Sequence, residues 1–258
     1  MSIKVIVATH KKSEMPTDSM YLPLHVGAQG EAPLPYLGDD TGDNISAKNP
    51  IFSELTGLYW AWKNLPDEYV GLVHYRRYFA VRHFRSKQPL KRVLTGEQAE
   101  ELLRGRDGIL PAPRQYVIET LYSHYMHTSY VEPLDVAGEI IAEKYPDYLP
   151  AFERLKSRTS GHMFNMFILR RDHLDAYCSW LFDILFELER RVDASRYTPY
   201  HARFCGRVSE LLFNVWLENH PLDCVILPLM HTNVINWFVK GGAFLAAKFM
   251  GKKYEKSF

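Results

Sequence analysis

Two short apolar runs, each followed directly by polar and charged residues, constrain the fold of this chain most. Residues 3–8 form a β-branched run that opens into the sequence THKK, and residues 69–73 form a second run that opens into HYRRYF. Unbroken apolar runs of this length are typical of strands buried on both faces of a parallel sheet, and such sheets bind ligands beyond the carboxyl ends of their strands. The sequence therefore predicts an α/β fold with a mostly parallel sheet, covering helices and chemistry at these two strand ends.

The remaining elements follow from periodicity and from the positions of proline and glycine. Asn49-Pro50 predicts a helix N-cap followed by proline in the first turn of an amphipathic helix. Further strands are expected at 108–111, 163–169 and 224–227, and further helices at 95–104, 174–188 and around 208–216. Residues 116–156 predict a helical insertion, so we expect one domain over residues 1–235 and a separate tail over 236–258.

Composition excludes several classes of function. The 258 residues include 31 lysines and arginines against 30 acidic residues, so a formal net charge of +1 provides no field for binding nucleic acid. The three cysteines are odd in number and lack C-x-x-C spacing, which argues against a disulfide framework and a structural zinc site. The sequence shows no signal peptide and no apolar segment of membrane-spanning length. We therefore expect a cytoplasmic protein that does not bind nucleic acid.

The first candidate site is the pair Arg76 and Arg77 in the HYRRYF sequence. Two guanidinium groups just beyond a buried strand can grip a diphosphate through bidentate hydrogen bonds. The alternative is that neighbouring side chains point to opposite sides of an extended segment, so that one arginine merely pairs with a surface carboxylate. We favour the site because the pair follows a strand of the sheet. The residues at the two strand ends that we expect to bind the same diphosphate-containing ligand, the donor, are Thr9, His10, Lys11, His74 and Tyr75.

The second candidate site is the acidic stretch of residues 39–46. Its oxygen ligands could hold a divalent cation such as Mn²⁺ or Mg²⁺, or could bind the hydroxyl groups of a ribose or hexose. An ordinary exposed turn has the same composition, and this alternative is at least as well supported. Arginines stand at the end of the 69–73 strand in place of an Asp-x-Asp pair, so a metal cofactor is not favoured. The residues expected to contact the donor here are Asp40, Asp43, Asn44 and Ser46.

The third candidate is Glu210, which the pattern places near the start of a helix and on a different face from its apolar stripe. A carboxylate that points into a cleft can act as a general base and take the proton of a hydroxyl group, and Glu210 is our candidate for such a base. An acid in the first helical turn can also serve only to complement the helix dipole, and the two interpretations are evenly matched. We further expect His162, Asn165 and Arg207 to bind the acceptor or the sugar, although a histidine beside an apolar strand is more often structural.

The tail over residues 236–258 combines aromatic and aliphatic residues with three following lysines. This pattern suits an interfacial helix that lies on an anionic membrane leaflet. The alternative is a helix docked on the domain, and Gly241-Gly242 weakens any continuous helix. We expect the tail to attach the protein, as a peripheral membrane protein, to the inner face of the cell membrane.

Several of these motifs together resemble a known family. They are DTGDNIS at residues 40–46, ELTxxYWxWKN at 54–64 and GLxHYRRYF at 71–79, supported by THK at 9–11, FNM at 164–166 and RxxE at 207–210. The chain is similar to a bacterial family of capsular, exopolysaccharide and O-antigen glycosyltransferases, long catalogued as a domain of unknown function. Some members of that family are linked to galactosyl or galactofuranosyl transfer. The resemblance implies a GT-A-like fold and a nucleotide-sugar donor that carries uridine.

The residues and the resemblance together predict a hexosyltransferase. It would move galactose or galactofuranose from a UDP-sugar to a lipid-linked oligosaccharide during surface polysaccharide synthesis, with Arg76 and Arg77 on the diphosphate and Glu210 on the acceptor. The alternative is a non-catalytic nucleotide-sugar or carbohydrate-binding module of the same fold, which release of free nucleotide from UDP-sugars would exclude. The sequence leaves open whether the chain forms a homo-oligomer.

Overall fold

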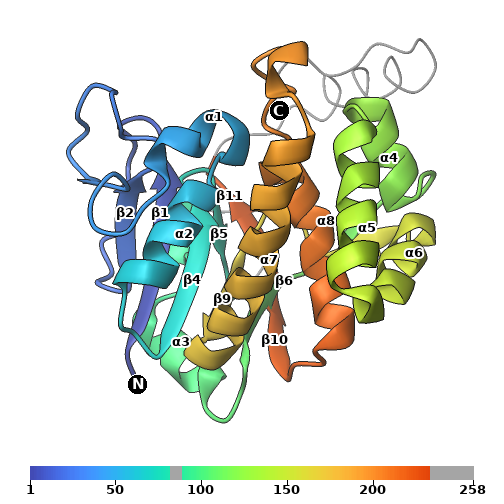
Figure 1. The fold of residues 1–258 in the computed structure, drawn as a ribbon. Coiled ribbons are helices and arrows are strands. Elements are labelled where there is room, and N and C mark those ends of the chain that lie inside the picture. The colour runs from blue at the N-terminus through green and yellow to red at the C-terminus, as the bar shows by residue number, and fades with distance from the viewer. Residues whose placement is uncertain (82–88, 233–258) are drawn as a thin grey trace.

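A mixed sheet forms the centre of the computed structural model, which describes residues 1–81 and 89–232 (Figure 1). Its strands lie in the order β10 (Cys224–Leu227), β6 (Gly108–Pro111), β9 (Phe167–Arg170), β4 (Tyr69–His74), β1 (Ile3–Thr9), β2 (Tyr21–His25) and β3 (Leu37–Gly38). Along this order β9 runs antiparallel to both of its neighbours, and the other adjacent pairs are parallel. The predicted α/β fold with a mostly parallel sheet is confirmed.

A hairpin continues the sheet beyond the end of β4. The chain turns back after His74 into β5 (Arg77–Phe79), which pairs with β11 (Leu229–His231). A second, two-stranded sheet joins β7 (Arg114–Gln115) to β8 (Ser160–Gly161). The hairpin places HYRRYF at a turn at the carboxyl edge of the main sheet.

Strand β1 shows why the sheet is buried on both faces. Val5 and Val7 belong to one apolar core, while Ile6 and Ala8 belong to the other, and all four are at most 3% exposed. Because side chains alternate along a strand, an unbroken apolar run is required when both faces are covered. The apolar run that predicted this strand therefore supplies buried side chains to both cores.

Eight α-helices lie in the part of the chain that the structure describes. They are α1 (Asn49–Phe52), α2 (Leu55–Asn64), α3 (Gly96–Leu103), α4 (Leu121–Thr128), α5 (Glu132–Lys144), α6 (Leu149–Ser157), α7 (Arg171–Arg191) and α8 (Phe204–Asn219). Helices α2 and α7 cover the face of the sheet that is nearer the viewer in Figure 1, and α3 packs into the core of the other face. Helix α2 approaches β2 so closely that a Cβ atom on Gly57 would lie 2.7 Å from Cγ1 of Val26.

The predicted helical region forms α4, α5 and α6 (Figure 1); α5 packs on α7 and α8, α6 packs on α8, and α4 packs on α6. Proline occupies the first turn of both α5 and α6, where its missing N–H removes no helical hydrogen bond. The boundaries of an inserted unit at 116 and 156 stay a prediction. The predicted tail of residues 236–258 lies outside the described residues.

Two local expectations are wrong, and two strands were not predicted. The helix predicted from Asn49 is interrupted at Ser53, whose φ is +53°, and Asn49 lies inside α1, where its side-chain amide donates to the Ser53 carbonyl oxygen. The strand expected from residue 163 begins only at residue 167, because Phe164 and Asn165 adopt left-handed φ values of 76° and 52°. Strands β2 and β3 are not among the strands that the sequence predicted, since neither has an unbroken apolar run.

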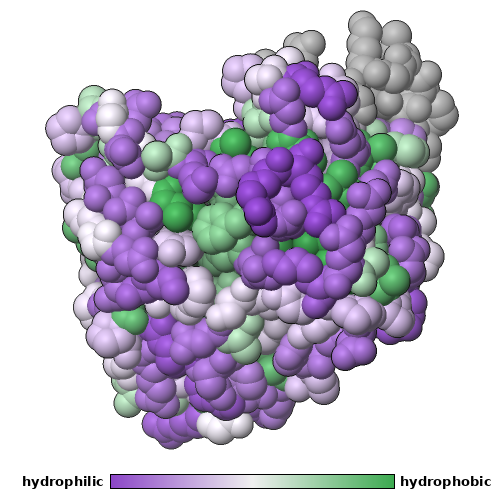
Figure 2. Space-filling model, viewed as in Figure 1, coloured by the Kyte–Doolittle hydropathy of each residue, from purple (hydrophilic) through white to green (hydrophobic). Residues whose placement is uncertain are grey.

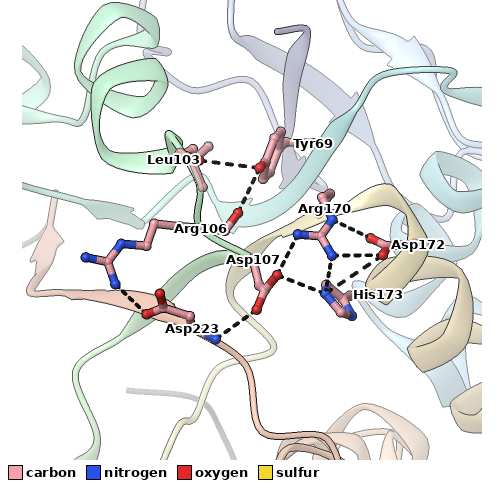
Figure 3. A network of polar contacts seen from close by, with 8 residues as sticks. All are labelled: Tyr69, Leu103, Arg106, Asp107, Arg170, Asp172, His173 and Asp223. Carbon is pink, nitrogen blue, oxygen red and sulfur yellow. Dashed lines mark hydrogen bonds and ion pairs between the residues drawn. The ribbon is translucent and has the colours of Figure 1, made fainter.

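An ion-pair network closes the opposite edge of the sheet, at the amino ends of the parallel strands (Figure 3). Asp107, just before β6, accepts hydrogen bonds from Arg170 at 2.6 Å, from the backbone N–H of Asp223 at 2.9 Å and from His173 at 3.1 Å. The guanidinium of Arg170 also binds Asp172. The network links β6, β9, α7 and the residue before β10 at the edge of the sheet opposite to the carboxyl ends of the parallel strands.

The surface shown in Figure 2 is mostly hydrophilic, and its upper outline dips between the part that contains β2 and the part that contains α7 and α8. Across residues 1–81 and 89–232, no helix combines the length and apolar character needed to cross a membrane.

Candidate active site

An open cleft of about 310 Å³ lies at the carboxyl ends of the parallel strands. Its lining includes the end of β1, the turn between β4 and β5 and the residues before α2. It also includes residues of β7, of α4, of the first turns of α8 and of the loop before β9. This is the edge at which open α/β sheets bind ligands.

The turn at Phe164 and Asn165 brings the reactive groups of the cleft together. The Phe164 N–H donates to Oε2 of Glu210 at 3.0 Å, and its carbonyl oxygen accepts from Nε2 of His74 at 2.6 Å. The buried Asn165 amide donates to Oε1 of Glu54 at 2.7 Å and accepts from the Ser209 hydroxyl. Two consecutive non-glycine residues with positive φ are costly, and these side-chain hydrogen bonds hold them in place.

Glu210 is partly buried in the lining, and its surroundings raise its pKa from 4.5 to about 7. Burial is the largest cause, and the neighbouring Glu54 carboxylate adds to it, while the Phe164 N–H and Arg77 oppose it. A carboxyl group with a pKa near neutrality can accept a proton and release it again at physiological pH. Glu210 lies in the second turn of α8, which begins at Phe204, so the alternative of a first-turn acid that only complements the dipole does not apply.

Glu54 is a second carboxylate in the cleft, and sequence reasoning did not select it as a site residue. It directly follows the strained Ser53 and stands at the start of α2, so the break between α1 and α2 turns it toward the cleft. Its only sequence signal was its place in the ELTxxYWxWKN motif. The Asn165 amide fixes one of its oxygens.

Five arginines line the cleft, and none forms an ion pair with a carboxylate in the described residues. They are Arg76, Arg77, Arg114, Arg203 and Arg207. Eight arginines elsewhere do form ion pairs: Arg106, Arg154, Arg158, Arg170, Arg171, Arg190, Arg191 and Arg196. The alternative in which one of the HYRRYF arginines pairs with a surface carboxylate is therefore wrong. Within residues 1–81 and 89–232, no carboxylate lies at ion-pair distance from these five guanidiniums.

Neutral groups position these guanidiniums. Arg77 lies over the Phe164 ring at 4.5 Å, and its buried Nε has no hydrogen-bond partner among the described residues. Arg203 donates to the Ser53 hydroxyl at 3.0 Å, and Arg207 donates to the Ser129 hydroxyl and the Tyr200 carbonyl oxygen. Burial lowers the pKa of Arg77, which shows that its charge is held in a poorly solvated place. Such a place strengthens the attraction of an anionic ligand.

The two strand-end histidines are neutral at physiological pH. Burial lowers the pKa of His74, and the neighbouring Arg77 and Arg76 add to this effect, while Glu54 opposes it. Burial, followed by the charges of Arg203 and Arg76, lowers the pKa of His10. Neutral His74 can therefore keep its Nε2–H for the Phe164 carbonyl oxygen.

Seven of the predicted site residues line the cleft: His10, His74, Tyr75, Arg76, Arg77, Arg207 and Glu210. The other predicted residues do not line it: Thr9, Lys11, Asp40, Asp43, Asn44, Ser46, His162 and Asn165. Thr9 is buried against the Lys11 backbone, and Nδ1 of His162 hydrogen-bonds to the Pro111 carbonyl oxygen. The Asn165 amide is engaged by protein groups on both its oxygen and its nitrogen, so its role is to position the site.

The acidic stretch folds as a turn organised around Asp39. This fully buried carboxylate accepts from the backbone N–H groups of Gly27 and Ala28 and from the hydroxyls of Ser46 and Thr56. Asp40 and Asp43, by contrast, are exposed. The structure shows an ordinary turn here, which was the alternative interpretation of this stretch. A contact between this turn and a sugar donor stays a prediction.

Residues 1–81 and 89–232 contain no group of three or more His, Cys, Asp or Glu side chains arranged to hold a metal ion. The acidic turn and the cleft both lie within this part of the chain.

Comparison with known proteins identifies the family. The profile described as "Domain of unknown function (DUF4422)" matches residues 4–221. The chain belongs to the DUF4422 family. The family resemblance inferred from the HYRRYF motif is thereby confirmed.

A solved structure extends this assignment. The DUF4422 chain is similar to the apo structure of the WbbM bifunctional glycosyltransferase, with a TM-score of 0.82 and 31% sequence identity. The match covers 90% of this chain and 46% of that chain, so this chain spans less than half the length of its relative. A comparison with curated proteins gives no match.

Proposed function

We propose that this DUF4422 protein is a glycosyltransferase that moves a hexosyl group, galactose or galactofuranose, from a UDP-sugar to a lipid-linked oligosaccharide. The observation that carries the proposal is the set of arginines at the carboxyl ends of the strands that form no ion pair with any carboxylate of the described residues. A nucleoside diphosphate has the charge and oxygen geometry that such guanidiniums bind. The likeness to a bifunctional glycosyltransferase supports one transfer activity for a chain that spans less than half of it.

In the proposed reaction an acceptor hydroxyl oxygen attacks the anomeric carbon of the donor sugar. The bond from that carbon to the β-phosphate oxygen breaks, and UDP leaves with its negative charge next to Arg76 and Arg77. Glu210 takes the proton of the attacking hydroxyl, for which its raised pKa of about 7 suits it. The identity of the sugar is proposed from the family resemblance. The location of the acceptor at the membrane is proposed from the sequence of the tail.

The donor test is release of UDP from a panel of UDP-sugars, with and without saccharide acceptors. We expect UDP release from UDP-galactose or UDP-galactofuranose that increases when an acceptor is present. Binding of UDP-sugars without any hydrolysis or transfer would contradict the proposal and favour a binding module.

Because we propose that the arginines, and not a cation, neutralise the leaving diphosphate, the proposed transfer does not need a divalent metal. We expect turnover in excess EDTA to equal turnover in Mg²⁺ or Mn²⁺. Full loss of activity in EDTA that Mn²⁺ restores would contradict this assignment of the arginines.

A further inference from the structure

Two carboxylates line the same cleft as the five arginines without pairing with them. Glu54 and Glu210 both belong to the lining, and neither forms an ion pair within the described residues. Neutral donors from two consecutive residues hold them instead. The Asn165 side-chain amide donates to Oε1 of Glu54 at 2.7 Å. The Phe164 N–H donates to Oε2 of Glu210 at 3.0 Å. One turn therefore fixes both carboxylates without an ion pair.

The contact to Asn165 determines which oxygen of Glu54 is left for a ligand. The same amide nitrogen donates to the Gly206 carbonyl oxygen, and the amide oxygen accepts from the Ser209 hydroxyl, so the amide cannot rotate toward another partner. Oε1 of Glu54 is thereby engaged by the protein. Across residues 1–81 and 89–232, no hydrogen bond or ion pair engages Oε2 of Glu54. This oxygen can accept a hydrogen bond from a group that enters the cleft.

The charge of Glu54 acts on residues that we propose for the reaction. It raises the pKa of Glu210, the proposed base. It also opposes the burial that lowers the pKa values of His74 and Arg77. A charge shifts the pKa of another group in this way when the two groups lie a short distance apart. Glu54 is therefore close both to the proposed base and to an arginine proposed to bind the diphosphate.

This position fits the sugar that is transferred. In the proposed reaction the anomeric carbon lies between the leaving diphosphate and the attacking hydroxyl group, so the sugar ring lies near both Arg77 and Glu210. A carboxylate near both residues meets the hydroxyl groups of that ring. A carboxylate accepts a charge-assisted hydrogen bond from a hydroxyl group, whereas it repels a phosphate.

We propose that Glu54 binds a hydroxyl group of the transferred sugar through Oε2. This inference rests on the proposed function and adds to it a residue that recognises the donor sugar. The two carboxylates then have different partners, because Glu54 binds the donor sugar and Glu210 takes the proton of the acceptor hydroxyl. The ribose of UDP also carries hydroxyl groups, so the test separates the ribose from the sugar.

The test compares Glu54→Gln with Glu210→Gln in the full chain by calorimetry. In E54Q the amide oxygen can keep the hydrogen bond from Asn165, which puts an NH₂ donor in the place of Oε2. In E210Q the amide oxygen can keep the hydrogen bond from the Phe164 N–H in the same way. UDP, UDP-galactose and UDP-galactofuranose are titrated into each chain. The ratio of the UDP-sugar Kd to the UDP Kd isolates the contribution of the sugar.

We expect E54Q to raise this ratio about 5- to 10-fold for the donor that the wild type prefers, because a charge-assisted hydrogen bond becomes at best a neutral one. The Kd for UDP alone should stay equal or fall, since a negative charge leaves the cleft. E210Q should keep the ratio within about 2-fold of the wild type, because Glu210 is proposed to contact the acceptor.

Monodeoxy analogues of the preferred donor provide a second measurement. The wild type should bind one of them about 10-fold more weakly than the parent donor, because that analogue lacks the hydroxyl group held by Glu54. In E54Q the same deoxygenation should cost at most about 3-fold. Equal costs in the two chains for every analogue would contradict the contact, whatever the stability of E54Q.

The outcomes separate this inference from the proposed function. A wild-type chain that binds no UDP-sugar and releases no UDP overturns both. A wild-type chain that transfers a sugar, with equal Kd ratios in E54Q and the wild type, overturns the role of Glu54 alone. Equal weakening of UDP and UDP-sugar in E54Q would indicate a contact to the ribose and would contradict the proposal. A rise of the ratio in E210Q equal to that in E54Q would show a general effect of charge in the cleft and would also contradict it.

Discussion

Replacing Glu210 by glutamine is expected to stop catalysis and to stabilise the fold. The glutamine oxygen can still accept from the Phe164 N–H, which now meets Oε2 at 3.0 Å, so the substitution preserves the shape of the turn. It removes the only group that we propose to take the proton of the acceptor hydroxyl. Loss of a general base typically costs about 10²- to 10⁴-fold in rate, and we expect kcat to fall by this amount.

The gain in stability follows from the raised pKa. Folding moves the Glu210 pKa from 4.5 to about 7, so the folded chain binds this proton more tightly than the unfolded chain does. The free energy of unfolding therefore falls as pH rises from 4.5 to 7, by about 3 kcal/mol at 1.36 kcal/mol per pKa unit. Glutamine does not ionise and avoids this loss. We expect E210Q to match the wild type near pH 4.5 and to be more stable by up to about 3 kcal/mol above pH 7.

Differential scanning fluorimetry from pH 4.5 to 8 measures this difference, and UDP release measures the catalytic loss. For a chain of this size about 3 kcal/mol corresponds to a rise of roughly 5–10 °C in melting temperature. Glu100→Gln is the matched control, because Glu100 is exposed on α3 and takes part in none of the polar contacts described above. In the wild type, kcat is expected to rise with pH through about 7 as Glu210 loses its proton.

Two results would refute the reasoning. A stability gain in E210Q that is the same at pH 4.5 and pH 8 would show that it does not come from ionisation of Glu210. Turnover in E210Q within 3-fold of the wild type, by the rough scale of base catalysis, would show that another group accepts the proton.

Three further substitutions test other parts of the structure. Arg77→Lys removes the forked donor set, so we expect calorimetry to show UDP binding about 10-fold weaker or more, with the exposed Arg104→Lys as control. Asp39→Ala leaves four hydrogen-bond donors without their buried acceptor and should cost about 3 kcal/mol or more in urea unfolding, whereas Asp40→Ala should cost less than about 0.5 kcal/mol. Asp107→Asn disturbs ion pairs between partly exposed side chains, so we expect it to lower the free energy of unfolding by less than roughly 2 kcal/mol, and a larger loss would contradict this reasoning.

Local sequence patterns predicted the part of the cleft lining that follows β1 and β4. An apolar run buried on both faces must be followed by polar residues where it reaches solvent, so β1 and β4 could be located together with His10, His74, Arg76 and Arg77. Their meeting in one cleft follows from parallel pairing, which brings the ends of neighbouring strands to the same edge.

The residues that the sequence did not reveal come from segments without a local signal. Arg114 and His124 reach the cleft only because α4 and β7 fold back over it, and their spacing from the strand ends carries no periodicity. Glu54 lines the cleft because the helix breaks at Ser53, and no glycine or proline at that position indicates a turn. In the acidic stretch, composition could not show that Asp39 points inward, because its hydrogen bonds to the turn after β2 and to Thr56 of α2 decide this.

Separate stretches of chain contribute to the lining of the cleft. Residues 8–10 and 74–77 lie at the ends of β1, β4 and β5, whereas residues 114–129 include α4, which packs on α6. Substitutions in the second stretch can accumulate over evolutionary time without shifting the register of β1 against β4. If the proposed function holds, relatives can differ in the acceptor that they bind while they keep the same residues at the strand ends.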